Sequence, residues 1–475
     1  MTRPAGTHPS HTYTKVVCTI GPSSSTPEAL RMLMMAGLDV ARVNFSHGTH
    51  AEHAVRIADI RRIAAELSRP VAILGDLQGP RIRVGHLDVP ITLVEGTEVT
   101  LAYESVARPT DIPVTYDALA HDVHVGARIL LDDGLLALDV LAIDGAFVRC
   151  VVVYGGLLKS HKGMNLPGVQ VSAPALTEKD RVDIAFAIEQ DLDYLALSFV
   201  RRPEDLDELR ALVPKSMLLI SKIEKDSALI DIENILKASD AVMVARGDLG
   251  VELPFEEVPI AQKRIITLAN RHGRPVITAT QMLESMIENP RPTRAEASDV
   301  ANAIFDGTDA VMLSAETAAG AYPRLAVEAM VRIAAEAERH PVPRGLGADR
   351  VEPGHASVEE TIAGATVTAV RMVGAPAVVV FTKSGFAARI VASRRPAVPI
   401  IAFTDQARTY RQLALVWGVT PVLVPHSDTY EEMATHARRV IVEMGVAKPG
   451  DKVVMTAGVP FDMPGTTNTL KVETV

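Results

Sequence analysis

The chain has 475 residues, of which 48% are hydrophobic and 22% are charged, and its formal net charge is −10. This length exceeds what one hydrophobic core organises, so we expect about three domains. The acidic balance argues against a general nucleic-acid-binding protein, because such a protein needs basic surface to meet phosphates. A small anionic substrate is still compatible, since a pocket can be locally basic on an acidic protein.

Cysteine usage and the amino-terminal segment both favour a cytoplasmic protein. Cys18 and Cys150 are the two cysteines, and residues so far apart predict neither a disulfide framework nor a metal knuckle. The segment Met1–His11 is polar and lacks the apolar stretch of a secretory signal. The sequence also lacks the run of about 18 apolar residues that a membrane helix needs. We therefore expect a soluble cytoplasmic protein with no membrane or nucleic-acid partner.

Short apolar runs alternate with amphipathic stretches through much of the chain. The runs are rich in Val, Ile and Leu without strict alternation, which is typical of parallel strands covered on both faces. Eight of them predict a (β/α)8 barrel formed by residues 1–83 and 172–345. The expected strands are Lys15–Ile20, Val40–Val43, Val71–Leu74, Tyr194–Leu197, Met217–Ile220, Ala241–Val244, Val276–Ile277 and Ala310–Leu313. The expected helices include Pro27–Ala36, His50–Leu67, Glu178–Gln190, Pro203–Val213 and Val258–Arg271.

One connection breaks this alternation. Residues 84–171 contain short β-like runs separated by turn signals, and we interpret them as a small β-barrel lid domain inserted on the active-site side of the barrel. The expected strands there are Ile91–Val94, Glu98–Leu101, Arg128–Leu131, Leu135–Leu141 and Ala146–Val153.

The last part of the chain, residues 355–475, is predicted to form a C-terminal α/β domain. It follows a Pro- and Gly-rich linker, Pro341–Pro353, and starts with a helical stretch at Val358–Met372. Strand-like runs follow at Ala377–Phe381, Ile400–Phe403, Pro421–Val424 and Lys452–Met455. We find no internal repeat in the sequence.

Polar and charged residues follow six of the eight expected barrel strands. In such barrels the carboxyl ends of the strands carry the active site, so these residues converge on one mouth. They are Arg42–Gly48, Asp76, Ser221–Glu224, Ala245–Asp248, Thr278–Gln281 and Ser314–Thr317. Any one of them alone is more often a salt-bridged or capping residue. Their convergence favours a shared site.

The residue types at this mouth indicate the chemistry. Lys222 and Glu224 are two positions apart in a strand, so their side chains share a face. Glu224 and Asp248 can share one Mg²⁺, a hard ion that takes carboxylates together with phosphate oxygens and water. Lys222 and Arg42 place positive charge where a phosphoryl group in transit is negative. Gly247 lets a ligand approach the backbone closely. These residues predict an anion-binding barrel enzyme that uses Mg²⁺.

An ordered set of motifs resembles the pyruvate kinase family over nearly the whole chain after its first dozen residues. The matching segments are Thr14–Pro22, Ala41–Gly48, Ser221–Glu224, Ala245–Gly250, Ala279–Met286, Pro290–Glu296, Met312–Thr317 and Pro464–Val472. The resemblance implies a glycolytic enzyme that transfers the phosphoryl group of phosphoenolpyruvate to ADP, giving pyruvate and ATP. It also implies a Mg²⁺ cofactor, for which Mn²⁺ can substitute, and a homotetramer.

The same resemblance implies roles for individual residues. Lys222 would stabilise the phosphoryl group in flight, and Arg42 would grip it. Glu224 and Asp248 would hold Mg²⁺, and the backbone around Arg246–Asp248, with Gly247 between them, would hold the substrate carboxylate. The route that protonates the enolate to pyruvate would include Thr280. The positions associated with nucleotide or phosphate contacts are Asn44, His47, Arg83 and Lys162.

One departure from the family pattern concerns the monovalent cation. Many members need K⁺ and carry Asp-Thr-Lys-Gly-Pro-Glu after the third strand, where this chain has Asp76-Leu77-Gln78-Gly79-Pro80-Arg81. Leu77 replaces a threonine of the cation site, and Arg81 replaces the glutamate, whereas the other cation-site residues Asn44, Ser46 and Asp76 remain. Because a fixed cation can supply the charge of a bound one, we expect activity without added K⁺. The alternative is that Arg81 only pairs with a nearby acid.

The C-terminal domain resembles the effector domain of the family. Thr382, Lys383, Ser384 and Gly385 follow an apolar strand and precede a helix, where backbone N–H groups can receive a phosphate. The resemblance implies allosteric activation by a sugar phosphate or a nucleotide monophosphate. However, Phe386 stands where better-marked effector loops carry a basic or hydroxyl residue. A purely structural turn is therefore an equal alternative.

Two other functions were weighed against this one. A Mg²⁺-dependent lyase or aldolase acting on pyruvate or phosphoenolpyruvate would share Glu224 and Asp248, but it gives no account of the inserted lid or the C-terminal domain. A sensor protein could keep the fold without catalysis, yet Lys222 and Thr280 are also retained. ATP formation, carbon–carbon cleavage and binding without turnover distinguish the three functions.

Overall fold

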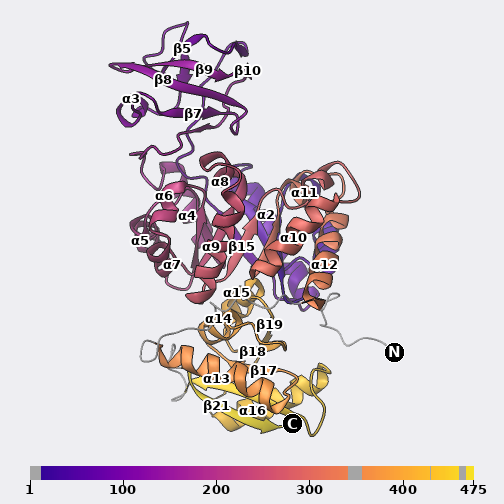
Figure 1. Ribbon diagram of the computed structural model, residues 1–475. Coiled ribbons are helices and arrows are strands. Elements are labelled where there is room, and N and C mark those ends of the chain that lie inside the picture. Colours follow the sequence, from indigo (N-terminus) through magenta and orange to yellow (C-terminus); the bar gives the residue numbers. More distant parts are fainter. Residues whose placement is uncertain (1–11, 341–355, 428, 459–466) are drawn as a thin grey trace.

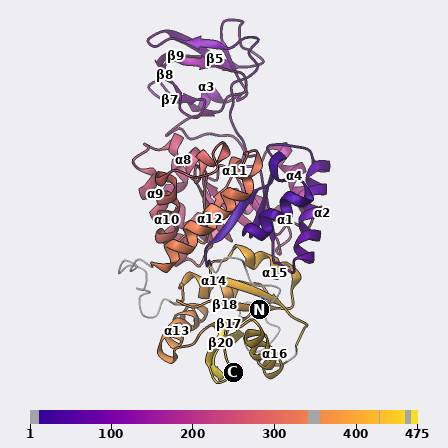
Figure 2. The same ribbon diagram turned by 90° about the vertical axis from the view of Figure 1, so that its right-hand side faces the viewer.

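The computed structural model describes residues 12–340, 356–427, 429–458 and 467–475. The chain forms three bodies in a row, with a barrel in the middle, the inserted domain beyond one of its ends and the C-terminal domain beyond the other (Figures 1 and 2). The predicted linker Pro341–Pro353 lies outside the described residues. None of the helices in the described ranges is long and apolar enough to cross a membrane.

Eight parallel strands close the central barrel in the order β1-β16-β15-β14-β13-β12-β3-β2, which confirms the predicted fold class. Their residues are almost all buried, because helices cover the outside and side chains fill the inside. This double burial explains the continuous Val, Ile and Leu runs. The strands are β1 (Lys15–Thr19), β2 (Val40–Asn44), β3 (Ala72–Asp76), β12 (Tyr194–Leu197), β13 (Leu218–Ile223), β14 (Ala241–Ala245), β15 (Val276–Ala279) and β16 (Ala310–Leu313).

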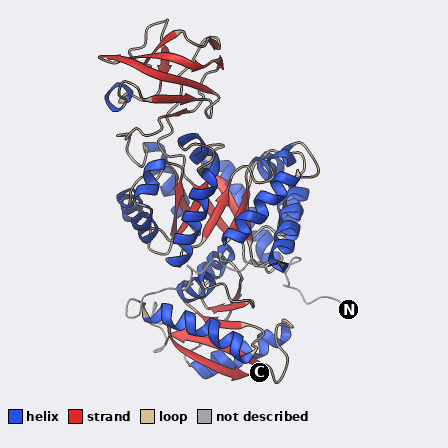
Figure 3. Ribbon diagram, viewed as in Figure 1, coloured by secondary structure: helices blue, strands red, loops and turns tan. Residues whose placement is uncertain are grey.

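Helices surround the barrel (Figure 3). Four of them begin at a threonine N-cap, whose hydroxyl accepts a hydrogen bond from the third helical N–H; these caps are Thr26, Thr49, Thr177 and Thr293. The helices are α1 (Pro27–Ala36), α2 (His50–Glu66), α4 (Glu178–Glu189), α5 (Pro203–Leu212), α6 (Asp226–Ile230), α7 (Ile232–Ala238), α8 (Arg246–Glu252), α9 (Val258–Arg271), α10 (Arg294–Asp306), α11 (Ala315–Ala318) and α12 (Pro323–Arg339), with the 3₁₀ turns η1 (Pro22–Ser24) and η2 (Glu284–Ile287).

The inserted domain leaves the barrel after β3 and returns before α4. It is a curled six-stranded sheet in the order β11-β7-β8-β9-β5-β6, with a separate β10-β4 pair. Its buried side chains form a hydrophobic core of their own, and Gly145 turns the β8–β9 hairpin with φ +64°. The elements are β4 (Ile91–Leu93), β5 (Glu98–Tyr103), β6 (Ile112–Val114), α3 (Leu119–Asp122), β7 (Arg128–Leu131), β8 (Leu136–Asp144), β9 (Phe147–Tyr154), β10 (Gly156–Leu158) and β11 (Met164–Asn165).

The C-terminal domain contains a five-stranded sheet in the order β19-β18-β17-β20-β21. The four predicted runs form its parallel strands, and β21 adds an antiparallel edge strand that was not predicted. Helices α13 and α14 pack on one face of the sheet and α16 on the other. The elements are α13 (Val358–Val373), β17 (Val378–Phe381), α14 (Phe386–Ser393), β18 (Ile400–Thr404), α15 (Ala407–Gln412), η3 (Leu413–Leu415), β19 (Val419–Leu423), α16 (Tyr430–Glu443), β20 (Lys452–Gly458) and β21 (Thr467–Thr474).

At the amino-terminal end of the barrel, aspartate recurs in the same structural position. Asp39, Asp193, Asp240 and Asp309 stand immediately before β2, β12, β14 and β16, and each accepts a hydrogen bond from a backbone amide of a neighbouring strand. Each carboxylate also pairs with an arginine. This recurrence escapes sequence inspection because one residue type recurs at unequal intervals.

The C-terminal domain docks on two of these aspartates. Two nitrogens of Arg395 lie 2.9 Å from the two carboxylate oxygens of Asp309, and Arg411 Nε lies 2.8 Å from Asp193 Oδ1. Between them, side chains of η3 join the buried cluster that fills the barrel interior. The C-terminal domain therefore closes the floor of the barrel and leaves the opposite mouth open to the inserted domain.

Replacing Arg395 with alanine should lower the free energy of unfolding by about 3–5 kcal/mol, because Asp309 would keep a buried charge without its partner. The two side chains are 2% and 4% exposed. Chemical denaturation followed by circular dichroism measures the change. The control is Arg439→Ala, which removes an exposed ion pair with Glu443 and should cost less than about 0.5 kcal/mol. Equal losses in the two variants would contradict the docking role.

Candidate active site

Lys222 lies at the centre of the barrel mouth, near the carboxyl end of β13. Its Nζ atom is 2.7 Å from Ser198 Oγ, 2.9 Å from Glu224 Oε1 and 3.2 Å from Asp76 Oδ1. Burial alone would lower the pKa of this ammonium, but the carboxylates of Asp76 and Glu224 outweigh burial and raise the pKa. Lys222 is therefore held as a buried cation with three partners.

Arg42 brings a second cation to the same carboxylate. Its Nε donates to Asp76 Oδ2 at 2.7 Å, and its Nη1 donates to Thr19 Oγ1 at 2.8 Å. Burial of Asp76 would raise its pKa, but Lys222 and Arg42 reverse that effect and lower it. One ionised aspartate thus holds two cations side by side.

Glu224 and Asp248 form a pair of neighbouring carboxylates. Glu224 Oε2 accepts a hydrogen bond of 2.7 Å from the amide of Phe199, and Asp248 lies in the first turn of α8. Burial and the charge of Asp248 raise the pKa of Glu224 despite the nearby Lys222. A divalent cation between the two carboxylates would relieve this repulsion, so the donor set fits Mg²⁺. Within the described ranges no three acidic, His or Cys side chains gather as a metal site, so other oxygens would complete the coordination.

Thr280 faces Gly247 across the ends of two neighbouring strands. The Gly247 amide donates to Thr280 Oγ1 at 2.7 Å, and this hydroxyl donates to the carbonyl of Ala279 at 2.6 Å. Helix α8 follows β14 directly and begins at Arg246. Gly247, Asp248 and Thr280 are thus assembled on one side of the mouth.

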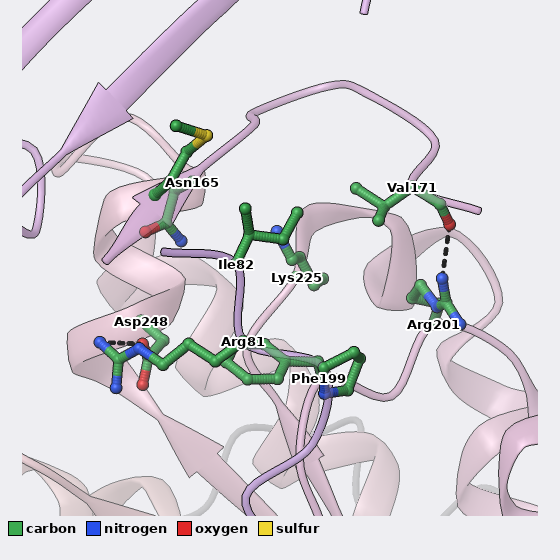
Figure 4. A pocket seen from close by; sticks show the side chains of 10 residues that line it. Arg81, Ile82, Asn165, Val171, Phe199, Arg201, Lys225 and Asp248 are labelled. Atoms are coloured by element: carbon green, nitrogen blue, oxygen red, sulfur yellow. Dashed lines mark hydrogen bonds and ion pairs between the residues drawn. The ribbon is translucent and has the colours of Figure 1, made fainter. Parts of the chain in front are cut away.

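A pocket lies between the barrel mouth and the strands that lead into the inserted domain (Figure 4). Arg81 points across it toward Asp248, with 3.9 Å between Nη2 and Oδ1, and the same nitrogen is 3.4 Å from Asp133 in the inserted domain. Asn165 of β11 and Lys225 also line the pocket. Arg81 therefore connects Asp248 of the barrel with the inserted domain.

The four residues associated with nucleotide contacts fall into two groups. Asn44 and His47 belong to the barrel loop after β2, where Asn44 Oδ1 accepts from the Ser46 amide at 3.1 Å. Arg83 and Lys162 belong to the strands that join the inserted domain to the barrel. Within the described ranges, neither a hydrogen bond nor an ion pair joins one group to the other.

The predicted effector turn lies in the C-terminal domain, far from the barrel mouth (Figure 1). Gly385 is the N-cap of α14, with φ +77°, and its amide donates to Thr382 Oγ1 at 3.0 Å. Thr409 donates its hydroxyl to the carbonyl of Lys383 at 2.6 Å. The Lys383 ammonium lies 3.8 Å from Asp405.

Sequence reasoning missed two groups at the mouth. Ser198 binds the Lys222 ammonium, and the amide of Phe199 binds Glu224, yet the end of the fourth strand was not examined as a source of site residues. The rule that used the other strand ends would have found this pair. Arg246 was noted only as backbone, and its side chain contacts the loop that carries Thr280.

Comparison with known proteins shows the family of the chain. The family model for the pyruvate kinase barrel domain matches residues 11–327, and the model for the pyruvate kinase alpha/beta domain matches residues 360–473. A pyruvate kinase of Geobacillus stearothermophilus is 49% identical over 470 residues, which are 97% of this chain and 80% of the relative. A pyruvate kinase of Staphylococcus aureus is 48% identical with the same coverage.

A solved structure gives the same result for the fold. The crystal structure of a pyruvate kinase from Cryptosporidium parvum superposes with a TM-score of 0.90 at 37% sequence identity, covering 98% of this chain and 96% of the other. The agreement therefore extends through the barrel, the inserted sheet and the C-terminal domain. The chain belongs to the pyruvate kinase family of phosphotransferases.

Proposed function

We propose that this chain transfers the phosphoryl group of phosphoenolpyruvate to ADP, giving pyruvate and ATP, at the barrel mouth. The observation that carries the proposal is the buried Lys222 ammonium, kept charged by Asp76 and Glu224 and placed beside Arg42. Two preorganised cations in a largely water-free site stabilise a phosphoryl group in transit much more than they would in water.

The reaction divides into two balanced steps. In the first, the bond between phosphorus and the enol oxygen of phosphoenolpyruvate breaks while a terminal β-phosphate oxygen of ADP bonds to the phosphorus. Lys222 and Arg42 bind the phosphoryl oxygens during this transfer. In the second, the enolate takes one proton at its methylene carbon and becomes pyruvate. Thr280 lies on the side of Gly247 and Asp248, and we assign its hydroxyl to the route that supplies this proton.

Mg²⁺ is the divalent cation that this donor set favours. Glu224 and Asp248 would hold it, and Mn²⁺ would fit the same hard oxygen ligands. When bound, the ion neutralises negative charge on the phosphoryl group and on the substrate carboxylate. The amides at the start of α8 would bind that carboxylate, and Asn44, His47, Arg83 and Lys162 would contact the nucleotide as the inserted domain closes.

Replacing Lys222 with methionine should lower turnover by about 10²–10³ or more, because one charge-stabilising group is lost from the transition state. Binding of Mn²⁺, followed by its electron paramagnetic resonance, should change little, since both carboxylates remain. A coupled assay for pyruvate measures turnover. Near-normal turnover in this variant would contradict the role assigned to Lys222.

Three structural observations support K⁺-independent activity. The side chain of Leu77 is buried in the barrel core, where it offers no oxygen to a cation. Both carboxylate oxygens of Asp76 lie against Arg42 and Lys222. The alternative is that Arg81 only pairs with a nearby acid. Such pairing still places its charge at the site, because one of the two acids near Arg81 is Asp248 itself. We therefore assign Arg81 as the internal cation of the site.

The wild-type chain should turn over in sodium buffer, and added K⁺ should change the rate less than about twofold. Arg81→Glu should lower the rate without K⁺ by about tenfold or more, because it reverses a charge near Asp248. Added K⁺ should then restore much of the loss. Arg149→Glu is a matched control, since Arg149 pairs with exposed carboxylates of the inserted domain. A K⁺ requirement in the wild type, or no rescue of Arg81→Glu, would contradict the assignment.

We also propose that a sugar phosphate or nucleotide monophosphate activates the enzyme through the turn Thr382–Gly385. This turn immediately precedes α14 and follows Phe381, which lines a pocket together with Phe403 and His436.

We further propose a homotetramer. An apolar groove between α10 and α12, to which Phe305 and Ile333 contribute, supports this proposal. The half-saturating phosphoenolpyruvate concentration with and without each phosphate, and the mass in solution, test these two proposals.

A further inference from the structure

The loop after β15 has an unusual backbone at the residue that carries the proposed proton route. Thr280 and Gln281 follow each other with φ +67° and +53°. Left-handed conformations are unfavourable for residues with a Cβ atom, and a β-branched threonine is an especially rare case. Two in succession persist only where the surroundings hold them. The loop therefore needs an external support.

The side chain of Arg246 supplies that support. Its Nη2 donates to the carbonyl of Thr280 at 2.7 Å and to that of Gln281 at 3.3 Å, and its Nε lies 3.4 Å from the carbonyl of Ala279. One planar guanidinium thus reaches three consecutive carbonyls, those of the two left-handed residues and of Ala279, which precedes them at the end of β15. A lysine has no rigid fork of donors and could not repeat this pattern.

Arg246 is itself fixed from the opposite side. Its Nη1 lies 2.8 Å from Asp299 Oδ1 and 2.7 Å from Asp299 Oδ2, on α10, and 3.4 Å from Gln262 Oε1 on α9. The Arg246 side chain is 10% exposed. Three helices and one loop therefore share a guanidinium that has little freedom to move.

We call the hydrogen bonds from the Arg246 guanidinium to this loop the Arg246 clamp, and they affect the position of the Thr280 hydroxyl. Gly247, the neighbour of Arg246, donates its amide to Thr280 Oγ1, and the hydroxyl donates to Ala279. Two sets of hydrogen bonds thus join the ends of β14 and β15: one from the Gly247 amide and one from the Arg246 side chain. Loss of the guanidinium would let Thr280 relax toward an ordinary backbone and carry its hydroxyl away from Gly247.

We propose that Arg246 is a positioning residue that sets the place of the Thr280 hydroxyl for protonation of the enolate. The inference rests on the proposed reaction, and it adds a residue that acts through Thr280 rather than on the phosphoryl group. The residues for the two chemical steps are held separately, since Asp76 binds Lys222 and Arg42 whereas Asp299 binds Arg246. Phosphoryl transfer should therefore survive a change at Arg246 that impairs proton transfer.

The test compares Arg246→Met with Arg210→Met. Arg210 also joins an aspartate, Asp240, to a backbone carbonyl, that of Met217, but at the opposite end of the barrel. Exchange of the pyruvate methyl protons for deuterium, with Mg²⁺ and ATP present, reports proton transfer by NMR. Rapid-quench measurement of ATP formed from phosphoenolpyruvate and ADP in the first turnover reports phosphoryl transfer.

Arg246→Met should slow the methyl exchange by about 10- to 100-fold, because small displacements of a reacting group have large effects on rate. First-turnover ATP formation should stay within about threefold of the wild type, and Arg210→Met should leave both rates near normal. Equal losses in the two steps, or no loss of exchange, would overturn the inference. A wild-type chain that forms no pyruvate would instead overturn the proposed function, so the two failures are distinguishable.

A second variant covers the case in which Arg246→Met does not fold. Asp299→Asn keeps the size of the side chain that anchors Arg246 and removes its charge. It should slow methyl exchange in the same direction by a smaller factor, with first-turnover ATP formation near normal. Normal exchange in folded Asp299→Asn and Arg246→Lys would overturn the inference as well.

Discussion

Asp76 binds two cations at once, and the arrangement of the barrel mouth depends on this shared carboxylate. Its two oxygens lie against Arg42 and Lys222, and these cations lower its pKa although it is fully buried. A buried ion pair of this kind contributes little net stability, because desolvation offsets the attraction. The pair instead fixes positions: Arg42 on β2 and Lys222 on β13 are both held against Asp76 of β3 before any anion arrives.

The two ends of the barrel use charge for different purposes. At the floor, aspartates accept backbone amides and bind arginines of the C-terminal domain. At the mouth, Asp76 holds Arg42 and Lys222, and two further cations, Arg81 and Lys225, line the pocket. Strand β12 belongs to both ends, because Tyr194 donates its hydroxyl to the Gln412 carbonyl at 2.7 Å while Ser198, next after the strand, accepts from Lys222. The C-terminal domain thus supports a strand whose other end holds the central lysine.

Helix α8 has a comparable double role between the barrel and the inserted domain. Asp248 lies in its first turn, and Glu252, one turn later, is buried against Lys225 and accepts a hydrogen bond from Asn165 of β11 at 2.8 Å. The helix that carries Asp248 is therefore in direct contact with the inserted domain. Arg246, at the start of the same helix, extends this connection to the Thr280 loop.

The sequence by itself determined the barrel strands, the inserted β domain and the placement of Arg42, Lys222, Glu224, Asp248 and Thr280 at or just after the carboxyl ends of barrel strands. Buried parallel strands need continuous apolar runs, and their polar ends stand out against them. Only the tertiary structure decided that Asp76 is shared, that Ser198 binds Lys222 and that Arg246 clamps a left-handed loop. It also decided that four distant aspartates meet at the barrel floor and that β21 completes the last sheet. These features depend on contacts between residues far apart in the chain, and no local pattern of residue types encodes such contacts.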